Sequence, residues 1–208
     1  MMTGSKTTQV ILSVVLAIAL SVLGFCVAFK MNLVETDMFG KEFKPKGKTL
    51  EALADSVVKE VINDDMDDVI KYKVLHDWLI NYAEVDTENK YVESESLNSG
   101  TVVLTTGKGT SESYAQAYQA LCKSANLYCR LTAGNVGDKY KDHTWNVVRI
   151  NNNFYHVDCL FDDTDKKDSP DGEQVYTYFL LSDKTLQKMR TFEPQGCSST
   201  TYEGKVKK

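Results

Sequence analysis

Apolar residues recur at helical spacing in three stretches of the chain, and each stretch predicts a helix. The first follows Thr49, a suitable N-cap, and its apolar face consists of Leu50, Leu53, Val57, Val58 and Val61. The second has an amphipathic face of Ile70, Val74, Leu75, Trp78 and Leu79. The third begins at Ser111, and its apolar face consists of Tyr114, Ala115, Tyr118, Leu121, Cys122 and Ala125.

Strand-forming patterns dominate the C-terminal half, where aromatic and β-branched residues alternate with polar ones. They predict strands at 128–133, 143–150, 154–161 and 176–181. A short capped helix is expected at 182–189. The segment 84–109 is polar with little period, and within it the short run 102–104 predicts an edge strand or an extended lead-in to the third helix.

The N-terminal region contains an uncharged apolar run at 10–29. At about 1.5 Å per residue, such a run is long enough to cross a hydrocarbon core of about 30 Å. We interpret it as a single-pass membrane anchor that leaves the rest of the chain outside the cytoplasm. A cleaved signal peptide, and hence a secreted protein, is the alternative, because Cys26-Val27-Ala28 offers small residues before a cleavage point.

The chain therefore divides into a tail at 1–9, an anchor at 10–29, a linker at 30–48 and one domain at 49–208. A content of 42% hydrophobic and 25% charged residues is that of a globular protein. The net charge of −5 and the absence of a Lys/Arg-rich run argue against a nucleic-acid partner, because phosphate binding needs clustered basic groups. The four cysteines beyond the anchor permit disulfides in three pairings, or serve as small buried hydrophobic residues.

The two longest predicted strands are separated by Asn151-Asn152-Asn153, and Asn tolerates the positive φ angles of a tight hairpin turn. If Asn151 and Asn152 form the turn, His143 lies one diagonal step from Asp158 on the same face of the sheet. The imidazole and the carboxylate can meet across that gap. A change of register by one residue would place them on opposite faces, so the pairing tests the turn.

Ser111 begins the third helix, where unpaired backbone N–H groups favour developing negative charge. It is therefore either a nucleophile candidate or an N-cap. The surrounding GTSES is not the nucleophile elbow G-x-S-x-G, because its last residue is Ser113. The GKGTS stretch also lacks the spacing of a phosphate-binding loop.

Three ordered motifs together resemble the transglutaminase-like superfamily. They are GTSESYA, where the family carries G-x-C-x-x-Y-A; HTWN, for H-x-W-N; and YHVDCLFDD, for Y-H-V-D-x-x-x-D-D. The resemblance implies a papain-like α+β fold, with N-terminal helices and a nucleophile-bearing helix packed on an antiparallel sheet. It also implies that His143 is the catalytic base and Asp158 its orienting acid. Trp145 and Tyr114 are then expected to line the site.

Ser111 occupies the place of the family's cysteine, and a hydroxyl is not ionised as a thiol is. Three explanations stay open: a working serine hydrolase, a silent module that binds in the retained cleft, or a replacement of the cysteine in an active protein. The first predicts hydrolysis or acyl transfer on amide or peptide bonds at the cell surface. The expected substrate or ligand is a peptide, a protein or the cell wall.

The remaining polar residues receive more ordinary interpretations. His156 shares a face with Asp158 and is expected to line the site or to pack beside the acid. His76 is expected to be a helix residue without a catalytic role. The acidic run at 162–173 lacks EF-hand spacing and predicts a solvated loop. Because the cysteines and histidines do not have zinc-ligand spacing, we expect neither a metal nor another cofactor.

Overall fold

The computed structural model describes residues 43–87, 99–137, 142–167 and 174–202. The predicted tail and anchor lie outside these residues. Within the described part of the chain, none of the helices is both long and apolar enough to cross a membrane. The end of the predicted linker packs on the domain, since Phe43 contacts the core and the backbone N–H of Lys46 donates to Ser56 Oγ (2.8 Å).

The three helices expected from periodicity are present as α2 (Leu50–Val61), α3 (Asp68–Tyr82) and α5 (Ser111–Ser124). The Thr49 side chain caps α2 by accepting from the backbone N–H of Ala52 (3.2 Å). Asp67 caps α3 in the same way, because its carboxylate accepts from the N–H of Ile70 (2.8 Å). Polar side chains thus satisfy backbone donors at these helix starts.

The second helix is not amphipathic as the apolar spacing predicted. In α3 the buried positions run without interruption from Val74 to Ile80 and include His76 and Asp77. Such a helix is covered on more than one side. The buried polar residues of α3 therefore need partners, which His76 finds in Asp162 on α6 and Asp77 finds in Lys73 and Tyr176.

The edge strand or lead-in expected at 102–104 is wrong, because these residues belong to helix α4 (Gly100–Thr106). Gly100 lies so close to α5 that a Cβ atom there would come within 2.6 Å of the backbone nitrogen of Ala117. This contact and the burial of Val103 and Leu104 override the strand preference of a Val-Val pair. Two short strands, β1 (Glu84–Val85) and β2 (Lys108–Gly109), pair in parallel beside α4.

The main sheet is antiparallel with strand order β3-β4-β5-β6. Its strands are β3 (Cys129–Gly134), β4 (His143–Ile150), β5 (Asn153–Val157) and β6 (Phe179–Leu181). Asn151 and Asn152 have φ angles of 48° and 66°, and Ile150 pairs with Asn153. The predicted turn and register are therefore confirmed.

The strand predicted at 154–161 ends early, at Val157. Helix α6 (Cys159–Lys167) follows at once, and the Asp158 carboxylate accepts from the N–H of Phe161 (3.3 Å) as an N-cap would. The expected solvated loop at 162–173 is wrong for its first part, which belongs to α6, with Asp162 0% and Asp163 3% exposed. The residues at 168–173 lie outside the described part of the chain.

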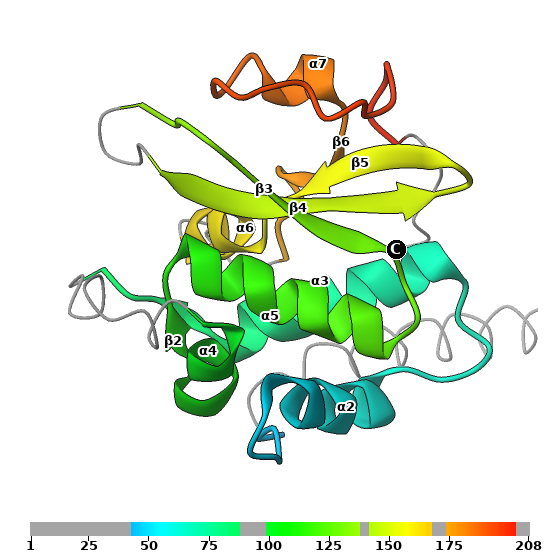
Figure 1. Ribbon diagram of the computed structural model, residues 1–208, viewed down its shortest axis with the longest axis vertical. Helices are drawn as coiled ribbons and strands as arrows, with labels where there is room; N and C mark the ends of the chain where they lie inside the picture. The colour runs from blue at the N-terminus through cyan, green and yellow to red at the C-terminus, as the bar shows by residue number, and fades with distance from the viewer. Residues whose placement is uncertain (1–42, 88–98, 138–141, 168–173, 203–208) are drawn as a thin grey trace, which may run out of the picture. The chain divides into compact units, whose positions relative to one another are not determined.

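Figure 1 shows α5 directly beneath the sheet, with α2 further from it, and the C-terminal segment with α7 (Asp183–Leu186) on the opposite side. Residues of α5 contact β3 and β4. The architecture is thus α+β, with a helix packed on an antiparallel sheet as expected. This packing places the N-terminus of α5 beside the beginning of β4.

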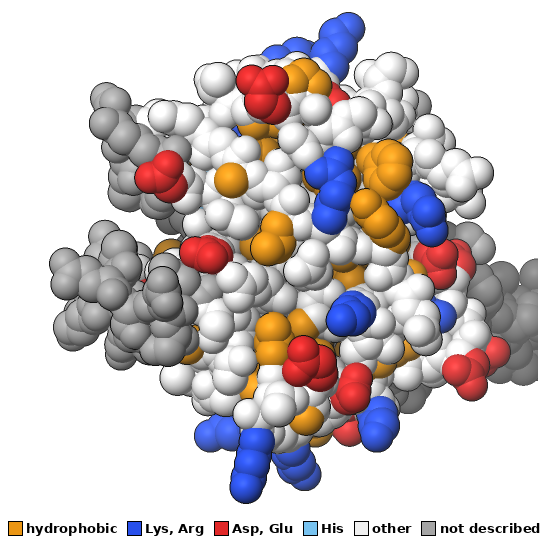
Figure 2. Space-filling view, in the orientation of Figure 1, with side chains coloured by type: hydrophobic (Ala, Val, Ile, Leu, Met, Phe, Trp, Pro, Cys, Tyr) orange, Lys and Arg blue, Asp and Glu red, His pale blue; other side chains and the backbone are white. Residues whose placement is uncertain are grey.

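The cysteines and the surface charges concern two further predictions made from the sequence. Each of the four cysteines in the domain is a free thiol, at Cys122, Cys129, Cys159 and Cys197. Figure 2 shows Lys and Arg side chains interspersed with Asp and Glu on the visible face, rather than a patch of one sign. That face does not have the charge distribution of a phosphate-binding surface.

Candidate active site

Ser111 is the first residue of α5, and it does not cap the helix. The N-cap is Thr110, whose backbone N–H donates to Ser113 Oγ (2.7 Å). Because Thr110 and Ser113 take the capping role, the half-buried Ser111 side chain turns toward the sheet. Its Oγ accepts from the backbone N–H of Thr144 at 3.3 Å, so the capping interpretation of Ser111 is wrong.

His143 and Asp158 are joined as the hairpin register predicted. His143 Nε2 lies 2.6 Å from Asp158 Oδ2, and the two residues are 1% and 2% exposed. At this distance the imidazole N–H donates to the carboxylate. Since Thr144 directly follows His143, the Ser111 hydroxyl lies beside the strand position that carries the imidazole. The structure thus brings the three residues together, while their catalytic roles remain predictions.

Arg190 is a member of this cluster that the sequence did not reveal. It is 5% exposed, and its Nη1 donates to the same Asp158 Oδ2 at 2.6 Å. Its guanidinium lies over three aromatic rings at 4.7–5.2 Å, those of Trp145, Phe161 and Tyr178. An arginine shortly after a short helix carries no periodic or motif signal, so only the folded chain shows that it is buried.

The charge on Asp158 is stabilised from two sides. Burial by itself raises the pKa of the Asp158 carboxyl, but the neighbouring His143 and Arg190 outweigh burial and lower that pKa below its usual value. The carboxylate therefore stays ionised at neutral pH. In this form it can hold the tautomer of His143 that carries the proton on Nε2.

Trp145 packs against His143. Its ring stacks on the imidazole with centroids 5.9 Å apart and an interplanar angle of 21°. The indole Nε1 donates to His156 Nδ1 (2.9 Å), and His156 Nε2 donates to Asp183 Oδ1 (2.7 Å). His156 therefore bonds to Trp145 and Asp183 rather than to Asp158, so the expected packing of His156 beside the acid is wrong.

His156, Asp183 and Cys197 come close enough to suggest a metal site. The hydrogen bonds argue against it. Because Nδ1 of His156 accepts from the indole, the proton of the neutral ring must lie on Nε2, the atom that faces the other two groups. Burial also lowers the pKa of His156, which favours this neutral form. A metal at Nε2 would require a second deprotonation of the ring, so the cluster does not fit a metal.

Tyr114 is 1% exposed and lies beneath the site. Its hydroxyl donates to Asp163 Oδ2 (2.9 Å), which joins α5 to α6. Ser111 is the first residue of α5, and Asp158 directly precedes α6. Tyr114 thus fixes the distance between the two sides of the site rather than lining an open surface.

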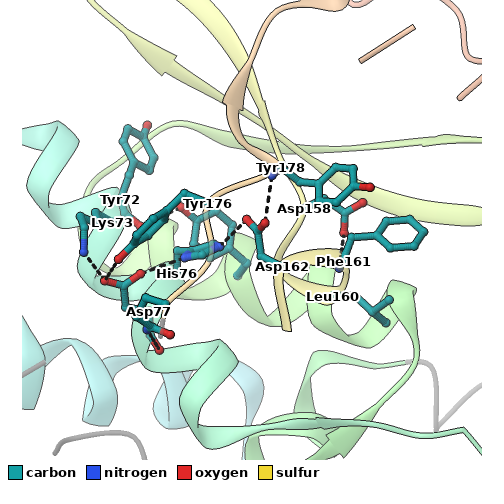
Figure 3. A network of polar contacts seen from close by, with 12 residues as sticks. Tyr72, Lys73, His76, Asp77, Asp158, Leu160, Phe161, Asp162, Tyr176 and Tyr178 are labelled. Atoms are coloured by element: carbon teal, nitrogen blue, oxygen red, sulfur yellow. Dashed lines mark hydrogen bonds and ion pairs between the residues drawn. The ribbon is translucent and has the colours of Figure 1, made fainter. Parts of the chain in front are cut away.

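A second buried histidine cluster lies on the other side of α6 (Figure 3). Nδ1 of His76 lies 3.0 Å from Asp77 Oδ1, and its Nε2 lies 2.9 Å from Asp162 Oδ2. Asp77 also bonds to Lys73 and accepts from the hydroxyl of Tyr176 (2.9 Å). His76 is a helix residue as expected, and its buried partners make it an ionic link between α3 and α6.

The surroundings of His76 favour its charged form. Burial lowers the pKa of the imidazole, but hydrogen bonds and charges from Asp162 and Asp77 outweigh burial and raise it to about 9. Burial likewise opposes the ionisation of Asp77, yet His76 and Lys73 lower the pKa of that carboxyl. Both ring nitrogens of His76 are donors in this state.

A pocket of about 500 Å³ lies along α5, next to α2 and β3, and includes Leu50, Gln116 and Leu131 in its lining. It contains none of the three residues of the candidate site. Its polar lining comes from α2 and α5, whereas Ser111 Oγ accepts from the backbone of β4. This pocket is therefore distinct from the place where the chemistry is expected.

Comparisons with known proteins agree with the motifs. The model of the transglutaminase-like superfamily matches residues 55–159, which include Ser111, His143 and Asp158. Kyphoscoliosis peptidase of Mus musculus is 21% identical over 123 residues, which cover 54% of this chain and 19% of the mouse protein. A crystal structure of a candidate cysteine protease from Cytophaga hutchinsonii is 21% identical with a TM-score of 0.43, and the similarity covers 53% of this chain and 36% of that one.

Proposed function

The chain belongs to the transglutaminase-like superfamily, and from this premise we propose that it acts on amide or peptide bonds through Ser111, His143 and Asp158. The observation that carries the proposal is the buried His143–Asp158 pair beside the Ser111 hydroxyl at a helix N-terminus. Hydrolysis and acyl transfer share the first half of this chemistry.

In the proposed reaction, Ser111 Oγ attacks the carbonyl carbon while its proton passes to Nδ1 of His143. Asp158 keeps the Nε2 proton in place and stabilises the imidazolium. Collapse of the tetrahedral intermediate breaks the C–N bond, and the proton on His143 passes to the departing amine. Water then releases the acid, or a second amine takes the acyl group, as His143 again accepts and returns a proton.

The negatively charged oxygen of the tetrahedral intermediate needs hydrogen-bond donors to stabilise it. Ser111 is the first residue of α5, and the N–H groups in the first turn of a helix lack intrahelical acceptors. The Ser111 N–H is therefore the proposed oxyanion donor, aided by the positive end of the helix dipole.

Three of the four thiols in the domain are poorly suited to replace Ser111 as the nucleophile. Burial raises the pKa of Cys122 and of Cys159 well above the ordinary value. Burial and the charge of Asp183 raise the pKa of Cys197 to about 12. Thiols in such surroundings are poor nucleophiles. The serine at the start of α5 is thus the residue on which the proposal depends.

A second candidate function is a silent module that binds a peptide or cell-surface partner in the family's cleft. One contact favours it: Ser111 Oγ already accepts an N–H from Thr144, which reduces the electron density available for attack. For both candidates we propose a location outside the cytoplasm, on the strength of the apolar run at 10–29. The proposed partner class is a peptide, a protein or the cell wall.

Intact-mass analysis after treatment with a fluorophosphonate tests the proposal. The full chain in detergent micelles, Ser111→Ala and His143→Ala are treated in parallel. A single adduct in the parent, absent from both variants, supports a serine nucleophile activated by His143. No adduct on a folded parent refutes the enzyme and leaves the binding module. An adduct that persists in Ser111→Ala also refutes the proposal.

A further inference from the structure

The strongest unexplained feature beside the site is the buried charge of Arg190. Among the residues that the structure describes, its side chain makes one ion pair, with Asp158. Among the described residues, Nε and Nη2 of Arg190 are buried without a hydrogen-bond acceptor and lie among aromatic rings. Burying a guanidinium with incomplete hydrogen bonds is costly, and such ion pairs rarely add net stability over apolar residues of similar size. Packing alone therefore does not explain why an arginine is buried at position 190.

We propose that Arg190 is a positioning residue that keeps His143 in its neutral form by neutralising the charge of Asp158. Asp158 Oδ2 accepts from both His143 Nε2 and Arg190 Nη1, each at 2.6 Å. A carboxylate alone would stabilise a protonated imidazole beside it. The guanidinium on the same oxygen cancels much of that attraction, so the imidazole remains available as a base.

This role rests on the proposed acyl chemistry and explains its unusual nucleophile. A cysteine at the start of α5 could exist as a thiolate beside an imidazolium, and a protonated histidine would suit it. A serine stays protonated until it attacks, and it needs a neutral base at that moment. The Arg190–Asp158 pair supplies the electrostatic setting that the serine at position 111 requires.

Among the described residues, the charged and titratable groups around His143 can be named individually. On its aromatic sides, His143 contacts Trp145 and Phe161 at ring distances of 5.9 and 4.4 Å, and neither ring titrates. In the part of the chain that the structure describes, Asp158 bonds to His143, Arg190 beyond α7 bonds to the same carboxylate, and Ser111 on α5 bonds to the neighbouring Thr144. Cys159 and Asp162, at the start of α6, interact electrostatically with Asp158. Arg190 is the fixed positive charge among these groups.

Histidine titration in the full chain tests the proposal directly. The chain contains three histidines, so ¹⁵N-histidine spectra in detergent micelles are simple, and the His143 signals are assigned by their loss in His143→Gln. In Arg190→Met we expect the His143 titration midpoint to rise by about one pH unit, because a like charge within ~4–6 Å disfavours protonation. In Arg190→Lys, which keeps the charge, the rise should be less than half as large. An unchanged midpoint in Arg190→Met, or equal shifts in both variants, would overturn the proposal.

A second pair of variants tests the same proposal if Arg190→Met does not fold. Asp158→Asn leaves Arg190 unbalanced, whereas the double variant Asp158→Asn/Arg190→Met replaces the ion pair by two neutral groups. We expect the His143 midpoint to be about one unit higher in the double variant than in Asp158→Asn. Equal midpoints would refute the electrostatic role.

Titration does not depend on catalysis, so the two proposals fail separately. A shifted midpoint without a fluorophosphonate adduct supports the role of Arg190 and refutes the enzyme. An adduct with an unshifted midpoint supports the enzyme and refutes the role of Arg190.

Discussion

Two buried histidine clusters lie on either side of the start of α6, and they use the same groups in different ways. In one, His76 contacts a carboxylate through each ring nitrogen, and these contacts hold α3 against α6 (Figure 3). In the other, His143 contacts Asp158 through Nε2, beside a hydroxyl at the N-terminus of α5. The first arrangement holds the imidazole between two acids, whereas the second is the one for which we propose proton transfer.

The position of the arginine sharpens this contrast. His76 lies between two acids, with Lys73 bonded to one of them, and its charged form is favoured. His143 shares its acid with Arg190, because Arg190 donates to the same carboxylate oxygen of Asp158. The number of carboxylates around an imidazole, and what else neutralises them, thus separates a structural histidine from a candidate base.

The largest expected difference concerns a thiol at position 111. In Ser111→Cys, the helix N-terminus and His143 should acidify the new thiol, so iodoacetamide should alkylate it at least about a hundredfold faster than Cys197 at pH 7. Peptide mapping by mass spectrometry follows both sites. Adding His143→Gln should remove most of this advantage, and adding His76→Gln should leave it largely intact. Equal effects of the two histidine changes would break the comparison.

The next effect is the pH dependence of stability contributed by His76. Its pKa is about 9 in the folded chain and near 6.5 when unfolded, so the folded state holds more protons between these values. The free energy of unfolding should therefore fall as pH rises through this window, by roughly 2–3 kcal/mol between pH 6.0 and 8.5. Urea unfolding at several pH values measures it. His76→Gln should be less stable at pH 6.0 and should lose most of this slope; an unchanged slope would contradict the ionic link.

A smaller effect is expected to distinguish the two buried tryptophans, Trp145 and Trp78. Trp145 donates to His156, whereas Trp78 Nε1 is buried on α3 without an acceptor among the described residues. Trp145→Phe and Trp78→Phe remove the same volume from sites that are each 1% exposed. Trp145→Phe should cost about 1 kcal/mol more, the worth of one hydrogen bond. Chemical denaturation compares them, and a larger loss in Trp78→Phe would argue against the support of Trp145 by His156.

The smallest expected effect concerns the turn that sets the register of the His143 cluster. Asn152 has a φ of 66°, and Asn152→Ala should cost about 1 kcal/mol, because alanine disfavours the left-handed region. Asn153→Ala, at an exposed position outside that region, should cost much less. Thermal unfolding measures both. Equal costs would mean that the turn does not hold the register.

Much of the site could be predicted because its geometry follows from local patterns. The two Asn residues set the turn, the turn sets the strand register, and the register brings His143 to Asp158. Helical spacing likewise placed Ser111 at the start of α5. These inferences need only the periodicity and the turn preferences of nearby residues.

The features that the sequence did not reveal depend on partners far along the chain. Asp162 and Asp163 look like residues of a solvated acidic run, and they are buried because His76 and Tyr114 reach them from other helices. Arg190 likewise becomes a buried charge only where Asp158 and the aromatic rings meet it. Val103 and its neighbours favour a strand locally, but contact with α5 makes them helical.

The most direct test of the account is the rate of fluorophosphonate labelling in His143→Gln and His76→Gln, compared with the parent at pH 6.5 in detergent micelles. We predict that His143→Gln lowers the rate by about a thousandfold or more, because the base is removed. Folded His76→Gln should stay within about threefold of the parent, because it loses only the ionic link between α3 and α6. Parent-like labelling of His143→Gln, or an equal loss in both variants, would contradict the assignment of the two histidines.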